Sequence, residues 1–180
     1  MSYAALLKEA KSLALELKRL DQRVVFAESC TGGLAAGALA SVPGVSKYFC
    51  GSFVTYRDDS KIRWLGVSRA VAQRGAVQPH VAIAMAKGAL KKTPEADFAA
   101  AITGHLGPKA PKGQDGLVFF AAAWRSKSRV QVRVYQSAIL PQQPRQSKLK
   151  QATQGAKLRE KRQVRASHEF LRMVRSLLKT

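Results

Sequence analysis

The stretch Ala27-Glu28-Ser29-Cys30-Thr31-Gly32-Gly33 decides the fold of this chain. It follows an apolar run, Val24-Val25-Phe26, and precedes a run of small residues, Leu34-Ala35-Ala36-Gly37-Ala38-Leu39, that favours a helix. A strand that ends at hydroxyl and glycine residues and turns into a helix presents free backbone N–H groups at the positive helix end. The stretch therefore predicts a cradle for a phosphate or carboxylate, built from Ser29, Thr31, Gly32 and Gly33. An alternative interpretation is that the hydroxyl residues only cap the helix.

The composition fits one globular domain, which we place at residues 1–180. Hydrophobic residues make up 46% of the chain, and no apolar run is long enough to span a bilayer. The N-terminal residues lack the order of a signal peptide, so we expect a cytoplasmic protein without membrane contact. Cys30 and Cys50 form neither a disulfide framework nor a metal site, and we expect both to be buried thiols. Cys30 as a nucleophile, activated by the helix N-terminus, is the alternative for that residue.

The charge is strongly basic, with a formal net charge of +20. The last forty residues hold 11 Lys and Arg against 2 acidic residues. Such a balance predicts weak, salt-dependent attraction to polyanions. The basic residues are mostly scattered and no nucleic-acid module motif is visible, so a solvated basic face is the preferred interpretation.

The spacing of apolar residues predicts alternating helices and strands. We expect helices at 3–20, 31–41, 58–65, 79–92 and 157–178. We expect strands at 23–28, 52–56, 97–103, 117–124 and 129–138, the last two forming a hairpin. The polar segment from Gln142 to Gln154 is expected to be a mobile connection. This order predicts an α/β fold, a three-layer α/β/α sandwich with a mixed, mostly parallel sheet that ends in an antiparallel hairpin.

Polar clusters stand at the ends of several expected elements, where ligands of open α/β sheets collect. They are the Ser29–Gly33 cradle, Ser46, Tyr56 with Lys61, and the turn at Thr103-Gly104. A lysine desolvated at the start of a helix can act as a neutral general base for a serine hydroxyl. The alternative is a surface lysine beside a tyrosine on a sheet face, and the turn at Thr103 is equally compatible with a simple tight connection.

Several of these strings, in this order, resemble the C-terminal domain of the CinA (competence/damage-inducible) family. The strings are Ala27–Gly33, Pro43-Gly44-Val45-Ser46, Phe53-Val54-Thr55-Tyr56 followed by Lys61, Leu65-Gly66-Val67, Gly75-Ala76-Val77, Met85-Ala86-Lys87-Gly88-Ala89-Leu90, and Ile102-Thr103-Gly104 with Gly107-Pro108. The resemblance covers about residues 5–125 well and the C-terminal third loosely. Stand-alone members of this family are nicotinamide-nucleotide amidases.

The resemblance implies an amidohydrolase that converts nicotinamide mononucleotide to nicotinic acid mononucleotide and ammonia, without metal or cofactor. Carried over by motif, the nucleophile is Ser46, assisted by Tyr56 and Lys61. The nucleotide's phosphate and ribose are then held by Ser29, Thr31, Gly32, Gly33, Thr103 and Gly104, and an arginine of the C-terminal helix, taken as Arg162, contacts the substrate. Arg159 and Arg165 compete with Arg162 for that position.

The chain also departs from the family pattern. The segment Gly107-Pro108-Lys109-Ala110-Pro111-Lys112-Gly113 has fewer glycines than is usual there, and His105 and Leu106 replace small apolar residues. These differences leave open another amide-bearing nucleotide as substrate, and a non-catalytic module that binds nucleotides or nucleic acid. Trp64, Trp124 and the apolar helices suit a self-associating surface as well as a monomer core, and we expect a homo-oligomer.

Overall fold

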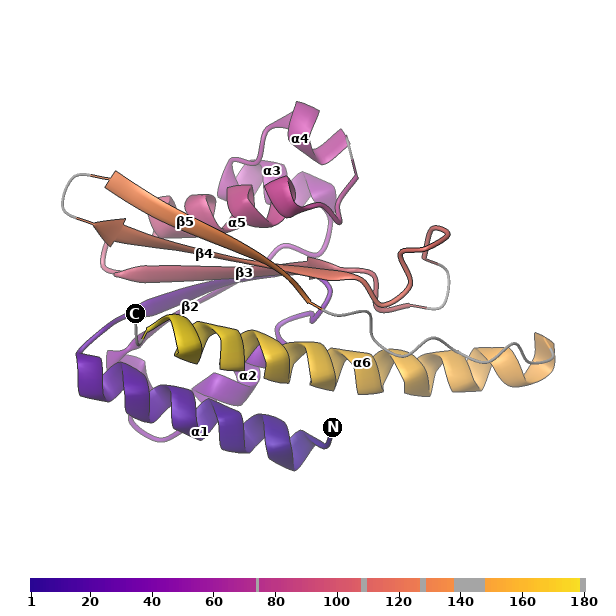
Figure 1. Ribbon diagram of the computed structural model, residues 1–180, viewed down its shortest axis with the longest axis horizontal. Coiled ribbons are helices and arrows are strands. Elements are labelled where there is room, and N and C mark those ends of the chain that lie inside the picture. Colours follow the sequence, from indigo (N-terminus) through magenta and orange to yellow (C-terminus); the bar gives the residue numbers. More distant parts are fainter. Residues whose placement is uncertain (74, 108–109, 127–128, 138–147, 179–180) are drawn as a thin grey trace.

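A five-stranded mixed sheet forms the middle layer of the molecule (Figure 1). The computed structural model describes residues 1–73, 75–107, 110–126, 129–137 and 148–178. The strands lie in the order β2-β1-β3-β4-β5, and their bounds are β1 Val24–Glu28, β2 Phe49–Val54, β3 Phe98–Gly104, β4 Val118–Ser126 and β5 Arg129–Ser137. β1 pairs in parallel with β2 and β3, whereas β3–β4 and β4–β5 are antiparallel. The predicted α/β class, the mixed sheet and the antiparallel hairpin β4–β5 are confirmed, but the sheet is not mostly parallel, because β3–β4 and β4–β5 are both antiparallel.

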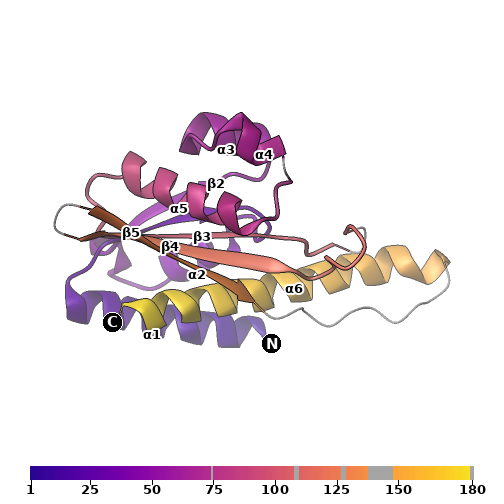
Figure 2. The same cartoon turned by 45° about the horizontal axis from the view of Figure 1, so that its top comes forward.

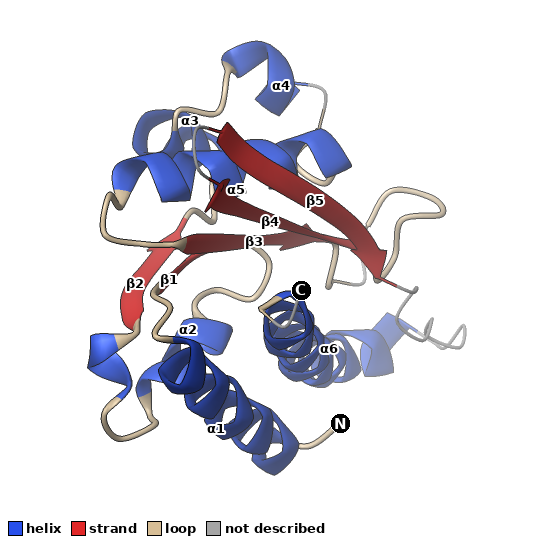
Figure 3. Cartoon of the chain, turned by 60° about the vertical axis from the view of Figure 1, so that its left-hand side comes forward, coloured by secondary structure: helices blue, strands red, loops and turns tan. Residues whose placement is uncertain are grey.

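Helices cover both faces of this sheet, as Figures 2 and 3 show. One layer holds α1 (Tyr3–Leu20), α2 (Leu34–Ala40) and α6 (Lys148–Leu177), and the other holds α3 (Asp58–Leu65), α4 (Arg69–Gln73) and α5 (Pro79–Lys92). A short 3-10 helix, η1 (Val45–Lys47), precedes β2. α1 packs along α6, and α5 lies across β3 and β4.

The strands contribute side chains to two separate hydrophobic cores, one on each face of the sheet, because successive side chains of a strand point to opposite faces. In β1, Val24 and Phe26 belong to the core under α1, α2 and α6, whereas Val25 and Ala27 belong to the core under α5. β3 and β4 repeat this alternation, and both are buried on both faces over most of their length. A strand covered on both faces reads as a continuous apolar run, which explains why the sequence locates these strands well.

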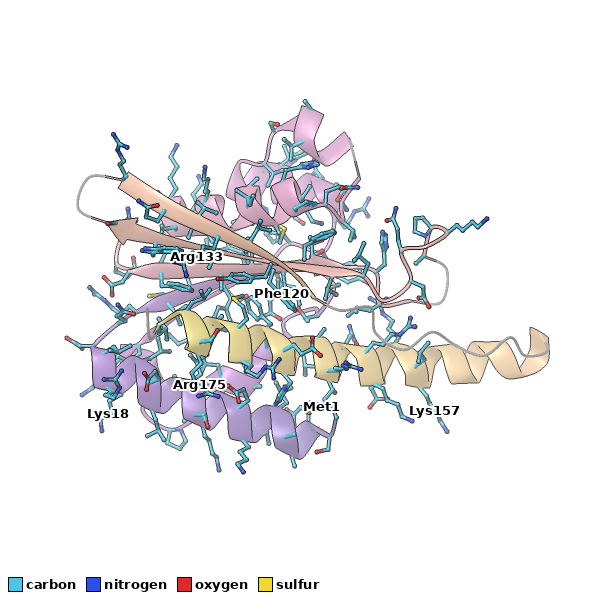
Figure 4. The ribbon with its side chains drawn as sticks, in the orientation of Figure 1. Met1, Lys18, Phe120, Arg133, Lys157 and Arg175 are labelled. Atoms are coloured by element: carbon cyan, nitrogen blue, oxygen red, sulfur yellow. The ribbon has the colours of Figure 1, made fainter. Side chains whose placement is uncertain are left out.

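Aromatic packing joins the sheet to α6. Phe170 of α6 lies with its ring centroid 5.0 Å from Phe26 and 6.1 Å from Phe120, and Figure 4 shows Phe120 between sheet and helix. Further along α6, Arg175 Nε donates to Glu9 Oε1 of α1 at 2.7 Å. α6 is thus fixed to the sheet by apolar contacts and to α1 by an ion pair.

The structure corrects three element boundaries. α2 begins at Leu34 instead of residue 31, because the Ser29–Gly33 segment forms a turn with Gly32 and Gly33 at positive φ. β2 spans 49–54 instead of 52–56. α6 begins at Lys148, so residues 148–154 of the expected mobile connection are helical, while 142–147 lie outside the described residues. Residues 148–154 contain no proline or glycine, which allows the helix to begin that early.

Candidate active site

A pocket of about 450 Å³ lies beyond the carboxyl ends of the parallel strands. The carboxyl ends of β1 and β3 and the segment after β2 meet at one edge of the sheet, where α/β folds commonly bind ligands. The pocket is lined by Ser29, Cys30, Tyr56, Lys61, Ala76, Val77, Thr103, Gly104, His105, Leu106, Gly107, Ala110 and Arg159. Five segments that are distant in sequence therefore contribute to one cavity.

Ser29 is the first residue after β1 and is only 7% exposed. Its N–H donates to the Ile102 carbonyl of β3 at 3.1 Å, so the neighbouring strand fixes its backbone. The turn that follows requires glycine, since Gly32 and Gly33 have φ of 65° and 94°. A Cβ on Gly33 would also lie 3.2 Å from Val54 Cγ2 of β2. The structure therefore places a nearly buried hydroxyl at the pocket wall on a constrained turn.

The predicted anion cradle at the start of α2 is wrong in one essential respect. The carboxylate of Glu28 accepts hydrogen bonds from Ala35 N at 3.1 Å and Ala36 N at 2.9 Å. These are the N–H groups that were expected to be free for a ligand. Thr31, Gly32 and Gly33 belong to the turn but are not among the described residues that line the pocket.

Glu28 itself is fully buried. Burial raises the pKa of its carboxyl, and hydrogen bonds from Ala36, Ala35 and Ser52 oppose that rise. Ser52 Oγ lies 3.3 Å from Glu28 Oε1, so the carboxylate also bridges to β2. An internal carboxylate thus neutralises the positive end of α2.

Lys61 and Tyr56 enter the pocket from the segment that follows β2. Lys61 is 1% exposed, and its Nζ donates to Asp58 Oδ1 at 3.2 Å and to the Tyr56 carbonyl at 3.5 Å. Tyr56 is 56% exposed, and its hydroxyl accepts a hydrogen bond from Arg159 Nη2 at 2.7 Å. The predicted pair is therefore brought together, with the lysine inside and the tyrosine at the mouth.

Ser46 does not reach this pocket. It is exposed on η1, before the first residue of β2, whereas Tyr56 and Lys61 follow the last residue of that strand. A six-residue strand separates the two ends of β2 by about 16 Å, at roughly 3.3 Å per residue. The structure therefore brings together two members of the predicted catalytic trio and leaves the third at the opposite edge of the sheet.

Arg162 is also placed differently from the prediction. It is 3% exposed and forms a bidentate pair with Asp115, with Nη1–Oδ1 at 2.6 Å and Nη2–Oδ2 at 2.8 Å. Arg159, one turn earlier on α6, lines the pocket instead. Arg165 pairs with Glu169 at 2.9 Å. The sequence offered three arginines, and only the packing of α6 selects Arg159.

Thr103 and Gly104 lie at the pocket as predicted. Thr103 is 1% exposed and its hydroxyl donates to the Ala76 carbonyl at 2.8 Å, so that proton is already committed. A Cβ on Gly104 would lie 2.8 Å from the Leu117 carbonyl oxygen, which explains the glycine. Gly107 and Ala110 line the pocket, while Pro108 and Lys109 lie outside the described residues.

Burial shifts the pKa values of two pocket residues, Cys30 and His105. Burial raises the pKa of the Cys30 thiol to about 12, which argues against Cys30 as a nucleophile. Burial lowers the pKa of His105, against opposing contributions from Gln114 and Asp115. In the sequence, His105 belongs to the turn after the expected strand at 97–103 and departs from the family pattern, and the structure places it in the pocket wall.

The described residues contain no group of three or more His, Cys, Asp or Glu side chains that could hold a metal ion. Within the same residues, no helix is both long and apolar enough to cross a membrane.

Comparison with known proteins identifies the family. The sequence model described as CinA C-terminal domain matches residues 7–160. A CinA-like protein of Geobacter metallireducens is 48% identical over 115 residues, which cover 62% of this chain and 28% of the relative. The matched region is thus about a quarter to a third of the length of the curated relatives.

Solved structures agree over almost the whole chain. The competence/damage inducible protein CihA from Agrobacterium tumefaciens has a TM-score of 0.77 and 30% identity, covering 98% of this chain and 96% of that one. A competence-damaged protein (CinA) superfamily protein from Escherichia coli has a TM-score of 0.74 and 28% identity, covering 100% and 94%. Together with the family match over most of its length, these likenesses show that the chain belongs to the CinA C-terminal domain family.

Proposed function

We propose that this protein is an amidohydrolase that converts nicotinamide mononucleotide to nicotinic acid mononucleotide and ammonia, with Ser29 as nucleophile. The observation that carries the proposal is that Ser29 and Lys61, both almost completely buried, line the same pocket. A serine and a lysine in one desolvated site are the pair that amide hydrolysis needs, a nucleophile and a base. The substrate class is the one that the resemblance to stand-alone members of the CinA C-terminal domain family implies, and membership of that family supports it.

The proposed reaction begins when the Ser29 hydroxyl attacks the carboxamide carbon and its proton passes to the Lys61 amine. The C–N bond then breaks, and the leaving nitrogen takes that proton from Lys61 and departs as ammonia. Water, activated by Lys61, hydrolyses the resulting ester and restores Ser29. Backbone N–H groups of the turn after Ser29, other than that of Gly32, which donates to the Ser29 carbonyl at 3.1 Å, are the proposed donors for the oxyanion.

The charges around the pocket support an anionic substrate. Arg159 lines the cavity, and its guanidinium reaches the Tyr56 hydroxyl at the mouth. Arginine binds phosphate through several donors in a fixed geometry. We therefore assign the substrate phosphate to Arg159 and the carboxamide to the buried end at Ser29 and Lys61. A cavity of about 450 Å³ is within the usual size for small-molecule sites.

The test is ammonia release from nicotinamide mononucleotide by purified protein. Ser29→Ala and Lys61→Ala should each lower kcat by at least about a thousandfold, since they remove the nucleophile and the base. Ser46→Ala is the matched control, because this exposed serine lies at the other edge of the sheet. Full activity of Ser29→Ala, or loss of activity in Ser46→Ala alone, would overturn the assignment.

The assigned phosphate contact has a test of its own. Arg159→Ala should raise KM for the nucleotide but leave KM for the phosphate-free riboside unchanged. An equal increase for both substrates would show that Arg159 does not bind the phosphate.

The excess of basic side chains supports a second candidate, the binding of polyanions such as nucleic acid. The net charge is +20, and Lys157 and Lys161 are exposed on α6, where Figure 4 labels Lys157. This candidate expects binding that weakens steeply with salt. Charge reversal at Lys157 and Lys161 together should then reduce oligonucleotide binding while ammonia release continues; unchanged binding would exclude α6 as the surface.

A further inference from the structure

Within little more than one helical turn, α6 contacts two residues that line the pocket, Tyr56 and Cys30, and one residue of the segment before β4, Asp115. Arg159 donates to the Tyr56 hydroxyl at 2.7 Å, and Arg162 holds Asp115 in a bidentate pair. The third contact is made by Gln163, whose Nε2 donates to the Cys30 carbonyl at 3.2 Å. Cys30 directly follows Ser29, so this last bond acts on the turn that carries the proposed nucleophile.

Gln163 contacts the turn through its Nε2, which donates to the Cys30 carbonyl and also lies near Gly32, at 3.9 Å from the position that a Cβ on that glycine would take. Because a peptide unit is planar, a hydrogen bond to the Cys30 carbonyl also fixes the direction of the Thr31 N–H on the other side of that unit. The half-buried Gln163 amide therefore sets the orientation of the backbone immediately after Ser29.

The opposite side of the same turn is held by Glu28. Its carboxylate joins Ala35 N and Ala36 N of α2 to Ser52 Oγ of β2. The turn is thus fixed from the sheet side by Glu28 and from the helix side by Gln163. The bidentate Arg162 pair next to Gln163 restrains α6 relative to the pocket loop, so that the amide of Gln163 is presented in a defined place.

We propose that Gln163 is a positioning residue for the reaction, which orients Ser29 toward Lys61 by binding the Cys30 carbonyl. The proposal rests on the proposed function. The matched part of the CinA family model, residues 7–160, does not include Gln163. Displacement of a reacting group by about 1 Å can cost about a hundredfold in rate, so a bond that holds the turn is expected to affect kcat more than KM.

The experiment compares three variants of α6 with the wild-type chain. Gln163→Leu keeps the volume but removes the donor, and should lower kcat by about ten- to a hundredfold with KM little changed. Gln163→Lys restores a donor of similar reach and should recover most of the lost kcat. Arg172→Leu, at an exposed position of the same helix, is the matched control and should leave kcat unchanged. An unchanged kcat in Gln163→Leu, or a loss that Gln163→Lys does not recover, overturns the proposal.

A second readout separates this proposal from the proposed function. In Gln163→Leu, amide hydrogen exchange of the turn at 29–33 should quicken by at least about tenfold, while exchange in α1 stays as in the wild type. If the wild-type protein releases no ammonia from the nucleotide, the proposed function fails, and the exchange rate still decides whether Gln163 holds the turn. Unchanged exchange at 29–33 would overturn the role of Gln163 even if Ser29→Ala is inactive.

Discussion

Replacing Gly88 by alanine tests whether α3 packs against α5 as described. It also tests the placement of Lys61, because that lysine lies on α3. Gly88 lies in the buried part of α5, where the backbone of α3 comes closest. A Cβ at this position would overlap the carbonyl oxygen of Leu65 and lie 2.9 Å from the Leu65 Cβ. Leu65 is the last residue of α3, one turn after Lys61. The added methyl group therefore pushes against the helix that carries the proposed base.

Two effects of opposite sign determine the magnitude. Alanine is a better helix former than glycine by about 1 kcal/mol. Overpacking of a well-packed core costs about 1–3 kcal/mol, and here the obstacle is backbone, which cannot rotate away. The difference is a net loss of up to about 2 kcal/mol in the free energy of unfolding, or a few degrees in melting temperature. A shift of α3 by about 1 Å should also lower kcat by about tenfold or more, because Lys61 moves with it.

Urea unfolding followed by circular dichroism measures the first effect, and ammonia release measures the second. Gly37→Ala in α2 is the matched control, since this glycine is exposed and a Cβ there would have no atom within 4 Å. That variant should gain about 0.5–1 kcal/mol. If Gly88→Ala is as stable as the control and fully active, α3 does not pack against α5 as described.

Three further predictions concern buried charges and the thiol in the pocket. Asp115→Ala removes the carboxylate bound to the buried Arg162 guanidinium and should lower the free energy of unfolding in urea by about 2–3 kcal/mol. Its control, Asp59→Ala, breaks an exposed ion pair and should lower this free energy by less than about 0.5 kcal/mol. Equal losses in the two variants would contradict the burial of Arg162. The Cys30 thiol, whose pKa is about 12, can be tested alone in a Cys50→Ser variant. At pH 8 it should react with iodoacetamide at least about a hundredfold more slowly than a free thiol, and rapid alkylation would disprove its burial. Burial raises the pKa of Glu28 in the native state, so the wild-type protein should become less stable relative to Glu28→Gln as pH rises from about 4 through the raised value. If the wild-type protein instead becomes more stable relative to Glu28→Gln over this range, the inferred direction of the pKa shift is wrong.

Local sequence patterns were sufficient for most of the fold. The continuous apolar runs of β1, β3 and β4 mark strands that are buried on both faces, and α3 ends at Leu65, with Gly66 in the left-handed conformation as its cap. α5 begins at Pro79 as predicted. These features depend on backbone preferences and on burial of a whole face, and both are encoded within a short stretch of chain.

The boundaries around the site were harder to predict for a physical reason. The start of α2 depends on Glu28, whose carboxylate takes the N–H groups of Ala35 and Ala36 from seven and eight residues away. The order of residues predicts that a helix N-terminus follows the turn. It does not show whether a carboxylate of the chain itself already accepts hydrogen bonds from the first N–H groups of that helix, as Glu28 does. α4 is missing from the predicted elements for a different reason: a helix of five residues is too short to show a clear period of apolar residues.

By itself the sequence determined the α/β class, the family, and the residue types from which the pocket is built. Only the tertiary structure decided which members of each type line the pocket: Ser29 and not Ser46 together with Lys61, and Arg159 and not Arg162. Motif order records the positions of side chains along the chain, whereas a site forms where strand ends converge. Ser46 and Lys61 are separated by the length of β2, while Ser29 and Lys61 line one pocket because β1 and β2 run parallel and end at the same edge of the sheet.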